Sequence, residues 1–201
     1  MGGGDKPLLK LGDQTLLAHV TQRLAPQCAG IILNANGDLT RFDMPALPVV
    51  QDSIPDNPGP LAGILAALDW AALYKPSVAW VMTVPGDTPF VPHDLALRLH
   101  EARETASTPL ACAGSGVHRH YTTGLWPVDL RHDMRRALTG GMRRVEDWMN
   151  LHGLAAAFWP TEPFDPFFNI NTPDDLIAAQ IINEQWASMD EADIKAGERD
   201  A

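Results

Sequence analysis

Val78-Ala79-Trp80-Val81-Met82-Thr83-Val84-Pro85-Gly86-Asp87 is the stretch of sequence that most strongly determines the fold. Its first part is dominated by apolar and β-branched side chains, which is typical of a strand buried in a sheet. The run ends at Pro85-Gly86, and Asp87 follows at once. The sequence therefore predicts a buried strand with a carboxylate at its carboxyl end.

Strand-like runs and helical patterns alternate on both sides of this strand. The predicted strands are 31–33, 48–51, 78–84, 109–113, 121–126 and 154–159, and the predicted helices are 16–24, 61–73, 94–104, 129–138, 144–151 and 173–186. Strands separated by single helices indicate βαβ units and a mostly parallel sheet. The predicted fold class is therefore α/β.

The chain length and composition bound the domain organisation. The 201 residues, 45% of them apolar, are enough for one globular domain with a full core. Neither a repeat nor a second domain boundary is visible, so a single domain is predicted over residues 1–187. Residues 188–201 are acidic and poorly apolar, and a disordered tail is expected there.

The charge and the cysteines exclude several classes of function. A formal net charge of −10 argues against broad binding of nucleic acid or of an anionic membrane, because both need a basic surface. No apolar run reaches about 18 residues, and the N-terminus has no apolar signal-peptide region. Cys28 and Cys112 are far apart without CxxC spacing. They fit a reducing cytoplasm and give no zinc site, so a cytoplasmic protein is expected.

Polar side chains follow three of the predicted strands at the same edge of the sheet. Asn34, Asp52 and Asp87 come just after strand-like runs, and in open α/β sheets ligands bind at the carboxyl ends of the strands. The chain also begins with Met1-Gly2-Gly3-Gly4-Asp5-Lys6. Taken alone, such a run fits a flexible tail, but its N–H groups and lysine also suit a phosphate. Together these features predict one shared ligand site.

The carboxylate of Asp87 has two interpretations. An aspartate just past an apolar strand can hold Mg²⁺, which prefers oxygen ligands and usually keeps several waters. The same residue can instead form a local turn or cap before the helix predicted at 94. Pro85 and Pro89 stiffen the loop, which suits a fixed ligand.

A second polar segment, Asn169-Ile170-Asn171-Thr172-Pro173-Asp174-Asp175, leads into the last predicted helix. Thr172, Pro173 and Asp175 fit the N-cap, the first helical position and the acid of a capping box. Asn169 and Asn171 have no such role, and they point the same way on an extended segment. Two amides on one face can orient a ligand or a metal-bound water.

Three further motifs each have a structural and a functional interpretation. The segment 57–63 is either a turn with a helix cap or a loop whose N–H groups face an anionic or nucleobase ligand. His118-Arg119-His120 and Arg143-Arg144 are either solvated surface or the cations that an anionic substrate needs. The histidines lack further ligands at zinc spacing. No GxSxG motif or Cys/His pairing suggests a catalytic nucleophile.

Taken in order, these motifs resemble the molybdenum cofactor guanylyltransferases. The first six residues resemble the end of that family's glycine-rich signature, and Asn34-Ala35-Asn36 resembles its strand-end asparagine motif. The other matching segments are Asp52, 59–63, 85–89, 124–127, 143–145 and 169–173. The similarity covers about residues 1–186.

The resemblance implies a Rossmann-like, three-layer αβα nucleotidyltransferase that transfers GMP from GTP to the molybdopterin-bound molybdenum cofactor and releases pyrophosphate. It implies that Lys6 contacts the GTP phosphates, that Asn34 and Asp52 bind the guanosine, and that Asp87 binds Mg²⁺ beside the triphosphate. Lys6 and Asp87 are then the catalytic pair. The residues implied on the acceptor side are Arg143, Arg144, Asn169 and Asn171. Molybdenum insertion proteins and molybdoenzyme chaperones are the implied protein partners.

The sequence departs from the family pattern in two places. His120 is followed by Tyr121 where the family has proline. The family's first strand and the first half of its loop have no counterpart, so a central strand between 31–33 and 78–84 is missing and both neighbours are left with unpaired backbone groups. We therefore expect Met1 to be an internal methionine. The expected start lies roughly 15–20 residues earlier, which allows about 5–6 residues for a strand and a glycine-rich turn. The alternative is a genuine short form that is inactive or rearranged.

Two alternative functions stay open on the sequence alone. A transferase that uses CTP or a sugar-phosphate acceptor would fit the same pattern, because the residues do not identify the base. A non-catalytic nucleotide- or cofactor-binding protein would fit the incomplete N-terminal loop. Nucleotide competition tests the first alternative, and pyrophosphate release tests the second.

Overall fold

A four-stranded sheet forms the centre of the molecule, in the order β5-β7-β6-β8. The computed structural model describes residues 6–42, 47–54 and 59–197, without the side chains of 187–197. The sheet strands are β5 (Trp80–Thr83), β6 (Leu110–Ser115), β7 (His118–Pro127) and β8 (Leu154–Trp159). β7 is antiparallel to β5 and β6, whereas β6 and β8 are parallel. Three of the four strands therefore run in the same direction. β7 lies between β5 and β6 and runs in the opposite direction, so the sheet is mixed.

Two smaller sheets lie towards the amino end of the chain. β1 (Lys10–Leu11) and β2 (Gln14–Thr15) form an antiparallel pair. β3 (Leu33–Asn34) and β4 (Val49–Val50) are parallel. Within the described residues no hydrogen-bonded ladder joins β3 to the four-stranded sheet, so the predicted strands 31–33 and 78–84 are not paired with each other.

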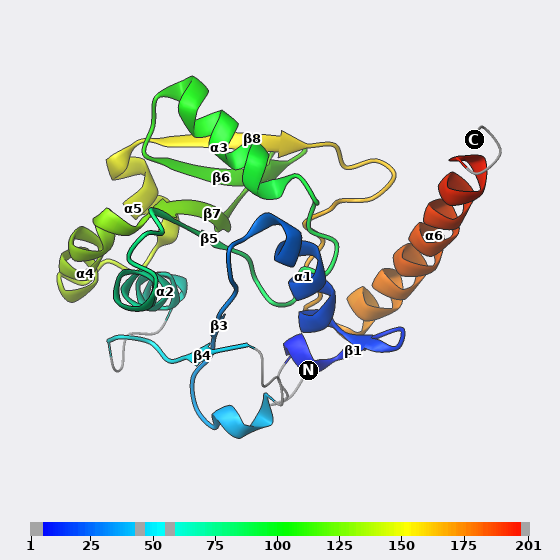
Figure 1. The fold of residues 1–201 in the computed structure, drawn as a ribbon, viewed down its shortest axis with the longest axis horizontal. Helices are drawn as coiled ribbons and strands as arrows, with labels where there is room; N and C mark the ends of the chain where they lie inside the picture. The colour runs from blue at the N-terminus through cyan, green and yellow to red at the C-terminus, as the bar shows by residue number, and fades with distance from the viewer. Residues whose placement is uncertain (1–5, 43–46, 55–58, 198–201) are drawn as a thin grey trace.

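Helices cover both faces of the main sheet (Figure 1). α1 (Leu16–Leu24) and α3 (Leu95–Ala106) lie on one face, and α2 (Pro60–Tyr74), α4 (Arg131–Thr139) and α5 (Val145–His152) lie on the other. α6 (Pro173–Gly197) follows at the carboxyl end. The three-layer αβα arrangement predicted from the sequence is confirmed. No helix of the described chain has the length and apolar character needed to span a membrane.

The side chains of β6 explain why this strand lies in the middle layer of the fold. All six of its side chains are buried, and they alternate between two apolar clusters. Leu110 and Cys112 pack with α2, α4 and α5, whereas Ala111 and Ala113 pack with α1 and α3. A strand buried on both faces reads as a continuous apolar run, which is how the sequence identified it.

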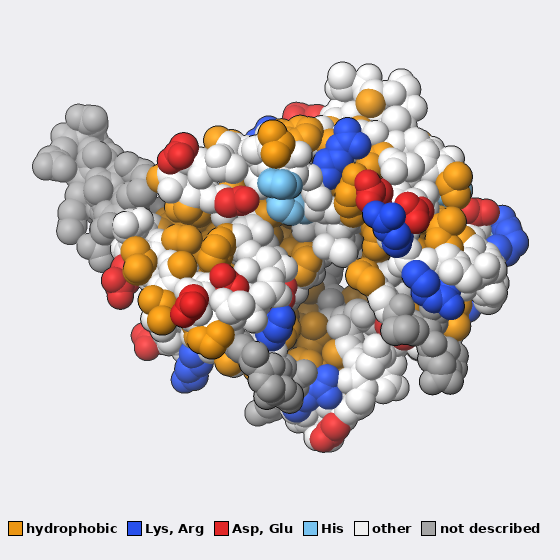
Figure 2. Space-filling view, turned by 180° about the vertical axis from the view of Figure 1, so that it is seen from behind, with side chains coloured by type: hydrophobic (Ala, Val, Ile, Leu, Met, Phe, Trp, Pro, Cys, Tyr) orange, Lys and Arg blue, Asp and Glu red, His pale blue; other side chains and the backbone are white. Residues whose placement is uncertain are grey.

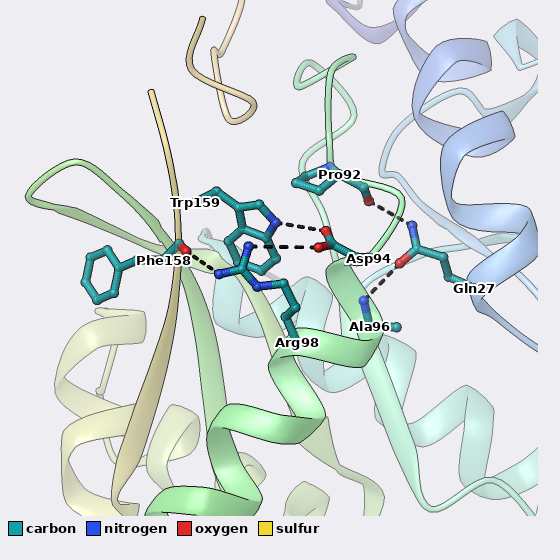
Figure 3. A network of polar contacts seen from close by, with 7 residues as sticks. All are labelled: Gln27, Pro92, Asp94, Ala96, Arg98, Phe158 and Trp159. Atoms are coloured by element: carbon teal, nitrogen blue, oxygen red, sulfur yellow. Dashed lines mark hydrogen bonds and ion pairs between the residues drawn. The ribbon is translucent and has the colours of Figure 1, made fainter. Parts of the chain in front are cut away.

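A network of polar contacts fixes α3 to its neighbours (Figure 3). Asp94 occupies the N-cap position of α3 but makes no capping bond. Its carboxylate instead accepts a hydrogen bond from Trp159 Nε1 at 2.9 Å. The backbone N–H of Ala96, in the first turn of α3, donates instead to Gln27 Oε1 at 2.9 Å. Gln27 also donates to Pro92 O. Residues from three segments thereby hold the loop that follows Asp87.

Two predicted boundaries differ from the structure. Residues 118–120, which lie between the predicted strands 109–113 and 121–126, are the start of β7, because Ser115 pairs with His118 across a tight turn in which Gly116 has a φ of 55°. The predicted last helix ends at 186, but α6 continues to Gly197 through part of the expected tail. Residues 187–196 contain neither proline nor glycine, and their alanine, glutamate and lysine favour helix.

Candidate functional site

The ends of β3 and β4 bring Asn34, Asn36 and Asp52 together. The Asp52 carboxylate accepts hydrogen bonds from Asn34 Nδ2 at 3.0 Å and from Asn36 Nδ2 at 2.9 Å. Asn36 Oδ1 in turn accepts the backbone N–H of Asp52 at 3.0 Å. This reciprocal bonding fixes the carboxylate at the strand ends, where the sequence predicted that Asn34 and Asp52 would meet. Its remaining lone pairs are able to accept N–H groups of a ligand.

Gly63 in the first turns of α2 makes room for this cluster. A Cβ at position 63 would lie 2.3 Å from Asn34 Oδ1, which is closer than any van der Waals contact. The glycine is therefore required because the side chain of Asn34 lies against the backbone of the helix.

Gly63→Ala should displace the Asn34 amide and weaken its bond to Asp52. We expect nucleotide affinity to fall by about tenfold, equivalent to about 1.4 kcal/mol, which is in the range of one hydrogen bond to a charged group. Calorimetric titration with nucleotide measures the change. Ala66→Gly, on the same helix and buried, is the control for general loosening of α2. Equal affinity of parent and Gly63→Ala would contradict this role of Asn34.

Lys6 lies beside the segment that precedes α6. Its Nζ donates to Asn171 Oδ1 at 2.8 Å, and its charge favours the ionised forms of Asp87 and Asp175. Asp175 is held by the N–H groups of Asn171 at 2.9 Å and Thr172 at 2.8 Å, and these bonds are the main reason its pKa is lowered. Thr172 Oγ1 accepts from Asp175 N–H, so the predicted capping box is confirmed.

Asp87 joins the same cluster from the end of β5. Its backbone carbonyl accepts the N–H of Ile170 at 3.0 Å, which ties the loop after β5 to the segment 169–171. Burial raises the pKa of the Asp87 carboxyl, and hydrogen bonding and the Lys6 charge only partly offset that shift. A Cβ at Gly86 would lie 3.1 Å from Pro7, so the residue next to Lys6 packs directly on this loop. Three segments far apart in the sequence therefore meet at Asp87.

The oxygens in this cluster suit a hard divalent cation. Asn169 Oδ1 is buried and has no hydrogen-bond partner, and its side chain also hydrogen-bonds Asp87. An orphaned amide oxygen next to a half-buried carboxylate is a fitting pair of ligands for Mg²⁺, which retains waters and takes further oxygens from phosphates. The described residues contain no group of three or more His, Cys, Asp or Glu that could hold a metal. The pair therefore fits a cation shared with a ligand rather than a closed protein site.

Arg143 and Arg144 lie in the connection between α4 and α5. Arg143 Nη1 donates to the carbonyls of Leu138 and Met142 at 3.0 and 2.7 Å. Arg144 is exposed and pairs with Glu146 at 2.8 Å and with Asp147. Among the described residues, no hydrogen bond or ion pair joins either arginine to Asn169 or Asn171. The backbone oxygen of Arg143 lies 3.8 Å from the Cβ position of Gly59, so this loop adjoins the start of α2.

Gly59 itself is the N-cap of α2, with a φ of 127° and a ψ of 164°. This region of backbone conformation is open essentially to glycine alone. Pro60 occupies the first turn of the helix, as the motif predicted. Asn57 and Pro58, like the first five residues of the chain, lie outside the described residues.

A partly buried polar triplet that the sequence did not reveal supports the segment before Asn169. Ser115 Oγ donates to Asp165 Oδ2 at 2.8 Å and lies 2.7 Å from His120 Nε2. Asp165 Oδ1 accepts the N–H of Phe167 at 2.9 Å. Burial lowers the pKa of His120, which favours the neutral ring. The sequence left open whether His120 belongs to the solvated surface or acts as a cation for the substrate. Its contact with Ser115 makes it a support of the β6–β7 hairpin. The hydrogen bond from Ser115 to Asp165 spans 50 positions of the chain, so no local motif predicts it.

Comparison with known proteins gives a consistent result. The profile of the MobA-like NTP transferase domain matches residues 1–154. A molybdenum cofactor guanylyltransferase of Nitrobacter hamburgensis is 54% identical over 191 residues, which is 94% of this chain and 90% of that protein. The structure of molybdopterin-guanine dinucleotide biosynthesis protein A from Archaeoglobus fulgidus is similar with a TM-score of 0.67 and 22% identity, over 91% of this chain and 92% of that one. A 2-C-methyl-D-erythritol 4-phosphate cytidylyltransferase from Thermus thermophilus shares the fold with a TM-score of 0.65 and 18% identity, over 90% and 95% of the two chains.

Proposed function

Because the chain belongs to the family of MobA-like molybdenum cofactor guanylyltransferases, we propose that it transfers GMP from GTP to the molybdopterin-bound molybdenum cofactor at the cluster of Lys6, Asp87 and Asn171. The single observation that carries the location is the meeting of three distant segments around one lysine, which donates to Asn171 and faces the Asp87 charge. A cation and a carboxylate fixed side by side at the carboxyl end of a strand suit a nucleoside triphosphate with its metal. We also propose that residues 1–187 act as one domain.

Asp87 and Asn169 would hold Mg²⁺ through the carboxylate and the free amide oxygen. When bound, the ion neutralises phosphate charge and orients the α-phosphorus for in-line attack by the terminal phosphate of the pterin. Asp87 is fixed for this task by the bond from Ile170 N–H. Lys6 contributes positive charge on the side where pyrophosphate leaves, and Asn171 orients the Lys6 ammonium. Phosphoryl-type transfer depends on positioning and charge, so it does not require a protein nucleophile.

Asn34 and Asp52 form the base and ribose end of the proposed site. The Asp52 carboxylate is a fixed acceptor beside an amide, and guanine presents N–H donors on its pairing edge. Arg143, Arg144, Asn169 and Asn171 would serve the acceptor. Asn171 supports this role best, because its amide already binds the lysine of the phosphate site, whereas Arg143 is committed to carbonyls of its own loop.

We place the reaction in the cytoplasm, because Cys28 and Cys112 are both free thiols, as expected in a reducing compartment. Molybdenum insertion proteins and molybdoenzyme chaperones are the proposed protein partners, acting before and after the reaction. The resemblance to the family supports them.

Asp52→Ala should weaken GTP binding by about tenfold and leave binding of the pterin cofactor within about twofold, because the cluster of Asp52 lies at the strand ends and not at the lysine. Parent protein should prefer GTP over CTP and ATP in calorimetric competition. Asp38→Ala, which removes an exposed carboxylate in the same region that accepts hydrogen bonds from Thr40, is the matched control. Equal binding of GTP and CTP would instead support the cytidylyl alternative, and absence of pyrophosphate release with bound GTP would support the non-catalytic one.

A further inference from the structure

The start of β7 carries an arginine that has no role in the site described above. Arg119 is exposed, and it pairs with Gly114 of β6 across the hairpin. In the part of the chain that the structure describes, no carboxylate forms an ion pair with Arg119. A guanidinium without a carboxylate partner keeps its charge and most of its N–H donors available for an anion.

The hydroxyl of Tyr121 fixes the direction of this guanidinium. Alternation along the strand places Arg119 and Tyr121 on one face, and their side chains are hydrogen-bonded. The Tyr121 O–H in turn donates to Glu146 Oε1 at 2.9 Å. Burial and the bond to Glu146 raise the pKa of Tyr121, so the hydroxyl keeps the proton that it donates. Tyr121 stands where the family pattern has proline, so that pattern does not supply this hydroxyl.

Glu146 connects Tyr121 to a second cation. Its Oε2 accepts a hydrogen bond from Arg144 Nη2 at 2.8 Å, and Asp147 lies 3.7 Å from the same guanidinium. Figure 2 shows basic and acidic side chains gathered side by side at the upper right of this view, with hydrophobic side chains next to them. Two carboxylates thus neutralise Arg144, which leaves Arg119 as the cation of the group whose charge is not paired.

These side chains lie beside the strand that leads to Asp87. Thr83 of β5 pairs with Gly124 of β7, and Thr83 Oγ1 donates to Thr122 O at 2.8 Å. Because the two strands are antiparallel, the start of β7 lies at the carboxyl end of β5. A substrate that reaches the triphosphate at Asp87 from this side of the sheet therefore lies over the start of β7.

Phe158 adds an exposed aromatic ring on the other side of Gly114. This glycine pairs with Phe158 of β8 as well as with Arg119 of β7. A Cβ at Gly114 would lie 2.6 Å from Cε1 of Phe158, so the ring extends over the glycine. Its side chain lies on the opposite face of β8 from that of Trp159 (Figure 3), and Phe158 is 43% exposed. A ring of this kind offers a flat apolar surface to a planar ligand.

The two groups are separated by the width of the strand between them. β7 and β8 are two strand spacings apart, or about 10 Å, and the ring of Phe158 shortens this gap because it extends over Gly114. A ring compound that carries a phosphate on a short side chain covers this distance. The order of the groups along the sheet edge is Asp87, then Arg119, then Phe158, which places the phosphate end of such a ligand nearest to Asp87.

We propose that Arg119, Tyr121 and Phe158 form a subsite for the acceptor, which they recognise as a phosphate monoester of a planar fused ring. The Arg119 guanidinium binds the phosphate, and the phenyl ring of Phe158 packs against the fused ring. Tyr121 is a positioning residue, because it acts on the ligand through Arg119. The subsite deepens the proposed transfer and rests on it for the identity of the acceptor.

Two soluble probes separate the phosphate from the ring: hydroxymethylpterin and its phosphate monoester. In calorimetric titrations of the 201-residue protein, the phosphate ester should bind at least about tenfold more tightly than the free alcohol, as expected for one charge-assisted contact. Arg119→Gln should abolish this difference and leave the affinity for the alcohol within about twofold. Phe158→Ala should weaken binding of both probes by about tenfold, since both carry the ring.

Tyr121→Phe tests the positioning role. The variant loses the hydroxyl but keeps the ring, which packs against the apolar cluster of α2, α4 and α5. In pyrophosphate release, KM for the molybdenum cofactor should rise by about fivefold, whereas kcat and KM for GTP should stay within about twofold. Combined with Arg119→Gln, Tyr121→Phe should cause no further loss, because both changes act on the same guanidinium.

Two exposed residues outside the subsite provide matched controls. Arg136→Gln removes another exposed guanidinium, and Leu151→Ala shortens another exposed apolar side chain. Neither should change the affinity for either probe. Equal losses in Arg136→Gln and Arg119→Gln would reduce the effect to net charge and overturn the proposal. So would unchanged affinity in Phe158→Ala, additive losses in the double variant, or inorganic phosphate that competes as well as the pterin phosphate.

The subsite and the proposed guanylyl transfer can fail separately. Pyrophosphate release that responds to the molybdenum cofactor, but whose KM for that cofactor is the same in Arg119→Gln and Phe158→Ala as in the parent, would support the transfer and overturn the subsite. Selective binding of the pterin phosphate through Arg119 in a protein that releases no pyrophosphate would support the subsite and contradict the transfer.

Discussion

Asp87→Asn should lower the rate of pyrophosphate release by at least about 100-fold, or about 2.7 kcal/mol of barrier. The carboxylate is the charged oxygen of the proposed Mg²⁺ site and feels the charge of Lys6, and an amide of the same shape removes its charge without opening a cavity. Mg²⁺ would lose its anionic ligand beside the triphosphate. The effect should appear mainly in kcat, because charge on the phosphates changes most in the transition state.

The same substitution should not destabilise the fold. Burial raises the pKa of Asp87 above its unfolded value, so the folded state disfavours the ionised form. A group of this kind contributes stability below its unfolded pKa and loses it as the pH rises through the folded pKa. At neutral pH the neutral asparagine removes this cost, and the metal-free variant should unfold at the same temperature or slightly higher.

Parent and variant should be compared in the same form of the chain, by pyrophosphate release and by calorimetric unfolding without metal. Asp129→Asn is the control, since its side chain is fully exposed at 104%. Activity of Asp87→Asn within about threefold of the parent, worth only about 0.7 kcal/mol, would remove Asp87 from the catalytic site.

The sequence predicted the parts of the site that depend on local patterns. Asn34 and Asp52 were predicted to meet because parallel strands end at a common edge, and the structure joins them directly. The capping box at Thr172 and Asp175 follows from spacing alone. In both cases the interacting residues are positioned by the nearest strand or helix, so periodicity is sufficient.

The features that the sequence did not predict depend on how segments far apart in the chain are arranged in the fold. Nothing in the strand pattern indicates that β7 lies between β5 and β6, although Gly116 in a tight turn is a local sign of a hairpin. The sequence left Arg144 open between solvated surface and substrate cation, and the structure pairs its guanidinium with the nearby carboxylates of Glu146 and Asp147. The contact of Ser115 with Asp165 requires the whole sheet to form before the two residues meet.

Lys6→Met should produce the second large loss, with kcat/KM for GTP about 100-fold lower, or about 2.7 kcal/mol. The ammonium donates to Asn171 at 2.8 Å and acts on two carboxylates, Asp87 and Asp175. Its removal leaves Asn171 without its donor and the pyrophosphate side without its cation. Methionine keeps the length and apolar stem of lysine, so the loss reports the charge rather than packing.

Two matched variants show whether this charge acts at its specific position. Lys6→Arg retains the positive charge and should recover part of the activity, but not all, because a planar guanidinium cannot reproduce the single short bond to Asn171. Lys10→Met removes a charge from the exposed face of β1, four residues along the chain, and should leave kcat/KM unchanged. If Lys6→Met and Lys10→Met lower kcat/KM equally, the effect of Lys6 comes from net charge alone. The meeting of the three segments at Lys6 would then be structural, and the triphosphate would have to bind elsewhere on the carboxyl edge of the sheet.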